Sequence, residues 1–126
     1  MINSTIFCLS LIVGSVIFNT ARAETLLERF DYTGQWNSDP NLCGVDSDGF
    51  LQIEPNVLFF LFERCDITKE YDNEYDIGLD LICQSEGEVS PAGSATISEG
   101  DHGIMILQLN NGYEETETTY EPCFNR

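Results

Sequence analysis

Basic residues are scarce in this chain of 126 residues, which has five lysines and arginines and one histidine against 22 aspartates and glutamates, a formal net charge of −17 at pH 7. Nucleic acid backbones are bound mainly through Lys and Arg, so this composition excludes a nucleic acid partner. It also disfavours anionic membranes. A cationic protein is the favoured partner, because an acidic surface steers it toward encounter. The same acidity also keeps an exported protein soluble.

Signatures of catalysis and metal binding are also missing. The sequence has no Gly-x-Ser-x-Gly elbow, phosphate-binding glycine loop or HExxH motif. The single histidine, His102, lies in a predicted turn among Gly and Asp. Residues 46–49 match part of a calcium loop but lack its essential carboxylates, so a turn is the simpler interpretation. We therefore expect no enzyme activity, no catalytic residues, no cofactor and no metal site.

The longest apolar run lies near the N terminus, at residues 6–18. It is too short to cross a bilayer, which needs about 20 apolar residues. Ala21-Arg22-Ala23 follows it with the small residues that signal peptidase requires. We expect residues 1–23 to be a cleaved signal peptide and residues 24–126 to be a single domain that is periplasmic or secreted. The alternative is an uncleaved anchor.

Four cysteines would remain after cleavage: Cys43, Cys65, Cys83 and Cys123. An even number in an oxidising compartment predicts two disulfides. Of the three pairings, we favour Cys43–Cys65 and Cys83–Cys123, because the first closes a loop and the second ties the last segment to the middle of the chain. No CxxC pair occurs, which argues against a zinc site.

Short strands separated by turn residues dominate the mature sequence. The clearest alternation is at residues 75–83, where Tyr75, Ile77 and Leu79 share one face. Seven or eight antiparallel strands, with no helix beyond a turn at residues 25–29, predict an all-β fold, namely a small antiparallel β-barrel or sandwich with two disulfides. The expected strands span residues 29–37, 50–54, 57–65, 75–83, 94–98, 104–109 and 113–123.

Gly34-Gln35-Trp36 lies in the first predicted strand. Here the chain resembles the calycins, whose first strand carries a Gly-x-Trp that closes the barrel floor. It is also similar to small exported bacterial inhibitors of lysozymes and proteases that use related disulfide-tied barrels. The resemblance implies that Gly34 and Trp36 form the floor of a barrel that acts by binding. The other interpretation of Trp36 is an ordinary core aromatic.

Residues 57–62 are apolar on both faces, although a strand with one wet face should alternate. Either the N-terminal residues 26–30 fold over the second face, or Phe60 and Phe62 form a surface for a partner or for self-association. The oligomeric state stays open at this point.

A second candidate surface is acidic. Residues 70–74 form the segment that we expect to be the most mobile loop. Its charged and aromatic residues make it a candidate for contact with a cationic partner, with Tyr71 as an aromatic anchor. The expected contact residues are Tyr71, Asp72, Glu74 and Tyr75.

We therefore expect an exported acidic binding protein, such as an inhibitor of a cationic lysozyme or protease. One alternative is a carrier of a small ligand in the calycin manner, with Trp36 and Phe59 lining a cavity. Large inward side chains such as Ile77 and Leu79 argue against it, because small barrels are usually filled. Another alternative is a structural envelope protein.

Overall fold

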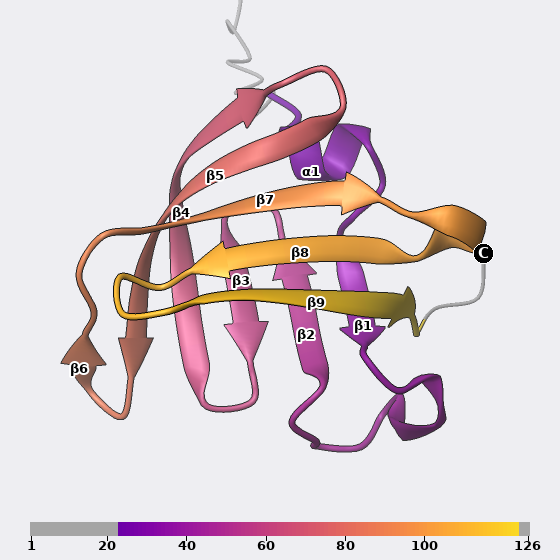
Figure 1. Ribbon diagram of the computed structural model, residues 1–126, viewed down its shortest axis with the longest axis horizontal. Helices are drawn as coiled ribbons and strands as arrows, with labels where there is room; N and C mark the ends of the chain where they lie inside the picture. The colour runs from indigo at the N-terminus through magenta and orange to yellow at the C-terminus, as the bar shows by residue number, and fades with distance from the viewer. Residues whose placement is uncertain (1–22, 124–126) are drawn as a thin grey trace, which may run out of the picture.

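The computed structural model describes residues 23–123, most of which belong to a single antiparallel sheet (Figure 1). The predicted signal peptide lies outside the described residues, apart from Ala23. In chain order the elements are α1 (Leu26–Arg29), β1 (Gly34–Asn37), η1 (Pro40–Leu42), β2 (Phe50–Glu54), β3 (Val57–Phe60), β4 (Glu63–Asp72), β5 (Asp76–Ser85), β6 (Glu88–Val89), β7 (Gly93–Glu99), η2 (Asp101–Gly103), β8 (Met105–Asn110) and β9 (Glu115–Pro122).

The sheet closes into an eight-stranded barrel. Strands β1 to β5 pair in sequence order, β5 then pairs with β7, and β7, β8 and β9 follow in order. Strand β9 returns to β1, where Trp36 lies opposite Pro122. The short strand β6 pairs only with the end of β5 and is additional to the barrel. The prediction of a small all-β barrel is confirmed, and closure removes the open edges that a flat sheet would expose.

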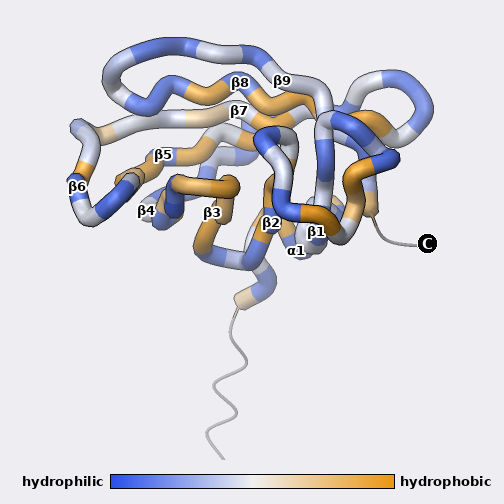
Figure 2. Tube along the Cα trace, turned by 90° about the horizontal axis from the view of Figure 1, so that it is seen from below, coloured by the Kyte–Doolittle hydropathy of each residue, from blue (hydrophilic) through white to orange (hydrophobic). Residues whose placement is uncertain are grey.

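Alternating side chains fill the interior of this barrel. On β5, the inward residues Ile77, Leu79, Leu81 and Cys83 are all buried. Figure 2 shows the corresponding hydrophobic stretches on β2, β3, β5 and β8, interrupted by polar residues. Tyr75 was expected on this face but is 85% exposed, because it precedes β5 and lies in a turn.

The predicted strand over residues 57–65 is wrong, because the chain breaks at Leu61 and Phe62 between β3 and β4. The break folds β4 back onto β3, so that Arg64 lies opposite Phe59. The Arg64 guanidinium lies 5.5 Å from the centre of the Phe59 ring. Arg64 therefore covers part of the outward face of β3.

Helix α1 lies toward the end of the barrel where β4 and β5 are joined (Figure 1). Thr25 and Glu28 form a capping box that starts the helix, and Leu27 is fully buried in the core. The Leu26 N–H donates to Glu70 Oε2 on β4 at 2.7 Å. The helix is therefore tied to β4, and cover of the second face of β3 by residues 26–30 stays a prediction.

The predicted disulfide pairing is also wrong, since the bonds join Cys43 to Cys123 and Cys65 to Cys83. Cys65 and Cys83 are direct partners in the register of β4 and β5, and both side chains are buried. The closing pair β1 and β9 carries the end of β9 to the loop that follows β1, where Cys43 lies. The two disulfides indicate an oxidising, extracytoplasmic compartment.

Within residues 23–123, no helix has the length and apolar character needed to cross a membrane.

Candidate functional site

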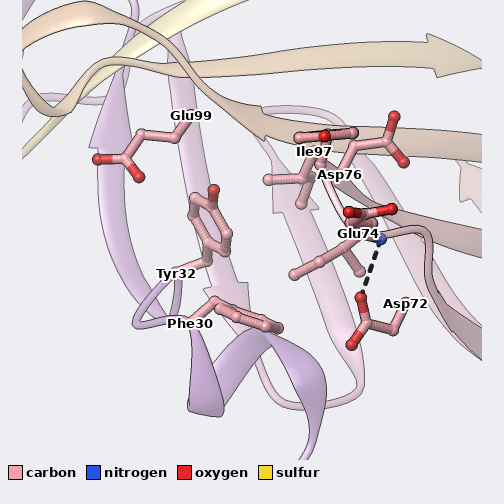
Figure 3. A pocket seen from close by; sticks show the side chains of 9 residues that line it. Phe30, Tyr32, Asp72, Glu74, Asp76, Ile97 and Glu99 are labelled. Carbon is pink, nitrogen blue, oxygen red and sulfur yellow. Dashed lines mark hydrogen bonds between the residues drawn. The ribbon is translucent and has the colours of Figure 1, made fainter.

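A cleft of about 230 Å³ opens beside α1, and three separate parts of the chain line it (Figure 3). The segment after α1 supplies Phe30 and Tyr32. The β4–β5 hairpin supplies Asp72 and the four consecutive residues 74–77. The end of β7 supplies Ile97 and Glu99. The nine lining residues are Phe30, Tyr32, Asp72, Glu74, Tyr75, Asp76, Ile77, Ile97 and Glu99.

Register brings these parts together. Ile77 on β5 lies opposite Ile97 on β7, and Asp76 lies opposite Ser98. Glu99 is the next residue of β7 after Ser98, so it lies close to Asp76 at the same end of the sheet. Both isoleucines are buried, so they form an apolar base beneath the carboxylates.

The hairpin at the rim is held by its own side chains. Asp72 Oδ1 accepts a hydrogen bond from the Glu74 N–H at 3.1 Å, which Figure 3 marks with a dashed line. Asn73 Nδ2 donates to Asp76 Oδ1 at 2.9 Å, and Glu74 has a positive φ of 75°. The expectation of a loop over residues 70–74 is wrong, because β4 extends to Asp72 and the turn beyond it is hydrogen-bonded.

Negative charge dominates the cleft. Four of its nine described lining residues are carboxylates, and none of the nine is basic. The Tyr32 hydroxyl has a raised pKa, first because of its burial and second because of the nearby Glu99 carboxylate. Tyr32 is therefore a neutral hydroxyl at physiological pH, able to donate or accept a hydrogen bond.

Aromatic and aliphatic surfaces lie next to these carboxylates. Phe30 is 49% exposed, and its ring lies at the edge of the cleft in Figure 3. Tyr75 projects into solvent at the rim. Such a combination suits a cation with an alkyl stem, because rings and aliphatic groups contact the stem while carboxylates and ring faces attract the charge. The volume is below the roughly 300 Å³ typical of pockets for drug-sized ligands, so it matches a single side chain.

Three of the four predicted acidic-surface residues, Asp72, Glu74 and Tyr75, line this cleft. Tyr71 does not. Its hydroxyl donates to Asp80 Oδ2 at 2.6 Å, and Lys69 Nζ lies 4.9 Å from the centre of its ring. The hydrogen bond to Asp80 is also the main reason for the raised pKa of Tyr71.

Sequence reasoning missed the other lining residues. Phe30, Tyr32 and Glu99 lie far from the hairpin in the sequence, and no local motif marks them. The signals that the sequence did carry were the aromatic-rich stretch at residues 29–37 and the turn that begins after Glu99. Only the pairing of β5 with β7 makes Glu99 a neighbour of Asp76.

Gly34 and Trp36, the predicted floor residues, lie in β1. Trp36 is only 2% exposed, and its indole N–H donates to the Tyr32 carbonyl oxygen at 2.8 Å. The Tyr32 and Trp36 rings lie 6.2 Å apart, centre to centre. Trp36 is therefore a core aromatic that also fixes the backbone of a residue that lines the cleft.

Phe60 and Phe62 lie at the opposite end of β4 from Asp72. Phe60 packs against the core, whereas Phe62 is 72% exposed in the turn between β3 and β4. Both line a shallow surface groove with Arg64 and Gln84. The predicted apolar and acidic surfaces are therefore separate.

The described part of the chain contains one group with metal-ligand spacing, formed by Glu63, Cys65 and Cys83, whose ligand atoms lie within 4.8 Å of one another. The two cysteines are joined in a disulfide. Metals bind the thiolate form of cysteine, so this group offers a metal only the Glu63 carboxylate.

Replacing Glu63 with glutamine should stabilise the protein at neutral pH. Burial, and secondarily Glu114, raise the pKa of Glu63, so the folded state favours its neutral form. The resulting stabilisation is fully present below the unfolded pKa of about 4.3 and is lost as pH rises through the higher folded pKa. Because the site is partly exposed, we expect E63Q to raise Tm by only about 1 to 3 °C at pH 7.

Thermal unfolding at pH 7 and pH 3.5 tests this prediction. The control is Glu88→Gln, which removes the same charge at an exposed position on β6. The Tm of E63Q should exceed the Tm of E88Q at pH 7, and this difference should be smaller at pH 3.5. An equal effect of the two variants at pH 7 would contradict the prediction.

Comparison with known proteins gives no assignment: no protein-family model, no curated protein and no solved structure matches this chain. Function must therefore be argued from the site, since a barrel alone hosts many functions.

Proposed function

We propose that this chain is an exported binding protein that recognises a cationic protein, and that it inhibits an enzyme such as a cationic lysozyme or protease. The proposal includes cleavage of the signal peptide after residue 23 and a periplasmic or secreted location. The single observation that carries it is the cleft beside α1, where four carboxylates converge on apolar and aromatic surfaces with no basic residue in the lining.

The charge of the whole molecule supports the same partner. A net charge of −17 attracts a cationic protein from a distance, and the cleft then offers a shaped contact. Hydrogen bonds within the hairpin hold the backbone that carries Glu74 and Tyr75, which lowers the entropy cost of ordering this backbone on association.

The resemblance to small exported inhibitors of lysozymes and proteases, which rests on Gly34-Gln35-Trp36 and the disulfide-tied barrel, adds the inhibitory role to this proposal. The carrier alternative has less support, because large side chains such as Leu79, Ile97 and Leu107 occupy the barrel interior.

Titration of the oxidised protein against a panel of cationic lysozymes and proteases tests the proposal. We expect saturable one-to-one binding to at least one enzyme, with loss of that enzyme's activity. The binding should survive at high salt, because a desolvated contact is screened far less than a diffuse one. Binding that disappears as salt is added would indicate generic attraction and would contradict the proposal.

Charge reversal in the cleft should identify the contact surface. Glu74→Lys places a cation among the remaining carboxylates and opposite a cationic partner, so we expect binding to weaken at least about tenfold. The matched control is Glu115→Lys, an exposed charge reversal at the start of β9, near the other end of β7 from Glu99. Equal loss in the two variants would show that only total charge matters.

A further inference from the structure

The acceptor atoms of the cleft are separated in space. Figure 3 shows Tyr32 and Glu99 on one side and Glu74, Asp76 and Asp72 on the other, with Phe30 at the edge. Asp72 and Asp76 each already use one carboxylate oxygen within the hairpin. Asp72 and Asp76 therefore each keep one oxygen outside these hydrogen bonds, and the acceptors of the cleft, including the Glu74 and Glu99 carboxylates, come from different elements.

This pattern distinguishes between the two cationic side chains of proteins. Arginine presents a rigid planar fork that is best matched by both oxygens of one carboxylate. The lysine ammonium is compact and has three rotatable donors, so it can reach single acceptors that lie in different directions. A set of acceptors shared between β7, the hairpin and Tyr32 fits the ammonium better.

The walls of the cleft suit the rest of a lysine side chain. The buried isoleucines Ile77 and Ile97 form its base, and Phe30 adds an aromatic surface at the edge. An unbranched alkyl stem can lie on the Phe30 ring above this base while its charged end stays among carboxylates.

We propose that the cleft receives a primary alkylammonium group, with its stem on the exposed Phe30 ring and its charge between Glu99 and Glu74. This inference rests on the proposed function, in which the ammonium belongs to a lysine of the cationic partner. A free amine has the same chemistry.

Two small probes that share one alkyl chain test the inference without a partner protein. We would titrate the oxidised protein with n-butylammonium and with n-butylguanidinium and follow backbone amide signals by NMR. n-Butylammonium should bind saturably, with the largest shifts at residues 74–77 and 97–99, and at least about threefold more tightly than n-butylguanidinium. No saturable shift, or equal or tighter binding of the guanidinium, would overturn the inference.

Variants locate the probe. Glu99→Gln should weaken n-butylammonium binding at least about fivefold, because it removes one of the facing charges. Glu115→Gln, which removes an exposed charge from β9, should leave that binding within twofold, as expected for a solvent-screened charge about a strand's length away. Equal effects of the two variants would also overturn the inference.

The source of the ammonium is tested separately with a partner from the enzyme panel whose lysines have been acetylated. Loss of binding on acetylation assigns the cleft to a lysine of the partner, whereas unchanged binding together with n-butylammonium binding assigns it to free amines. A partner that binds while n-butylammonium does not would overturn the inference and leave the proposed function standing. Binding of n-butylammonium without binding to any enzyme of the panel would support the inference and contradict the proposed function.

Discussion

Replacing Cys43 and Cys123 together with alanine should lower the free energy of unfolding by about 4 to 5 kcal/mol. This disulfide joins residues separated by 80 positions, so it restricts most of the unfolded chain. Its removal therefore raises the conformational entropy of the unfolded state. It also fastens the short seam between β1 and β9, where Trp36 pairs with Pro122, Asn37 pairs with Glu121, and the Cys123 N–H donates to the Gln35 carbonyl oxygen at 2.8 Å. The loss is large for a domain whose total stability is about 5 to 15 kcal/mol.

Urea denaturation followed by Trp36 fluorescence measures this loss. The comparison variant replaces Cys65 and Cys83, whose separation is only 18. Loop closure gives about 3 kcal/mol for such a loop, and removal of two buried sulfur atoms adds a packing loss. A loss below about 2 kcal/mol in the Cys43 and Cys123 variant, with native pairing confirmed in the parent by peptide mapping, would contradict the account of the seam.

The second large effect concerns Trp36, which should couple barrel stability to the cleft. Trp36→Ala removes a nearly fully buried aromatic side chain, which costs about 3 to 5 kcal/mol. It also removes the indole donor to the Tyr32 carbonyl. We therefore expect lower stability and, in the fraction that stays folded, weaker binding of n-butylammonium in the cleft.

Leu107→Ala is the matched control, because Leu107 is buried in β8 and is not one of the lining residues of the cleft. Its cost should be about 2 to 5 kcal/mol, with unchanged n-butylammonium affinity at a temperature where both variants are folded. If the Trp36 and Leu107 variants bound the probe equally well, the proposed link from Trp36 through Tyr32 to the cleft would be wrong. Trp36→Phe provides a milder test of the indole donor alone.

The sequence predicts those parts of the fold that depend on local periodicity. Strand β2 has the predicted limits, and the alternation of Ile77, Leu79 and Leu81 matches their burial in β5. Each of these features repeats every two residues, which is the period of a strand. A strand with one solvent-exposed face and one buried face can therefore be predicted from its own residues, without knowing which strands pair with it.

Features that depend on pairing between strands are not predictable in this way. The partner of Cys123 is Cys43 because β9 pairs with β1, and nothing in the cysteine spacing specifies that closure. The break between β3 and β4 has a similar origin. Residues 57–62 are uniformly apolar, so they lack the alternation that would mark the end of one strand at Phe60.

The candidate site shows the same division. Asp72, Glu74 and Tyr75 are adjacent in sequence, and their acidic and aromatic character was sufficient to single them out. Tyr71 was grouped with them, but its neighbours on β4 and β5, Lys69 and Asp80, hold its side chain elsewhere. Glu99 joins the cleft only through the pairing of β5 with β7.

The most direct test of the central claim is a residue-resolved NMR titration of the oxidised protein with an inhibited enzyme from the cationic panel. The account predicts that the largest amide perturbations fall on the β4–β5 hairpin at residues 72–77 and on Ile97 and Glu99. Perturbations centred on the groove at Phe60 and Phe62, or spread evenly over the acidic surface, would contradict it.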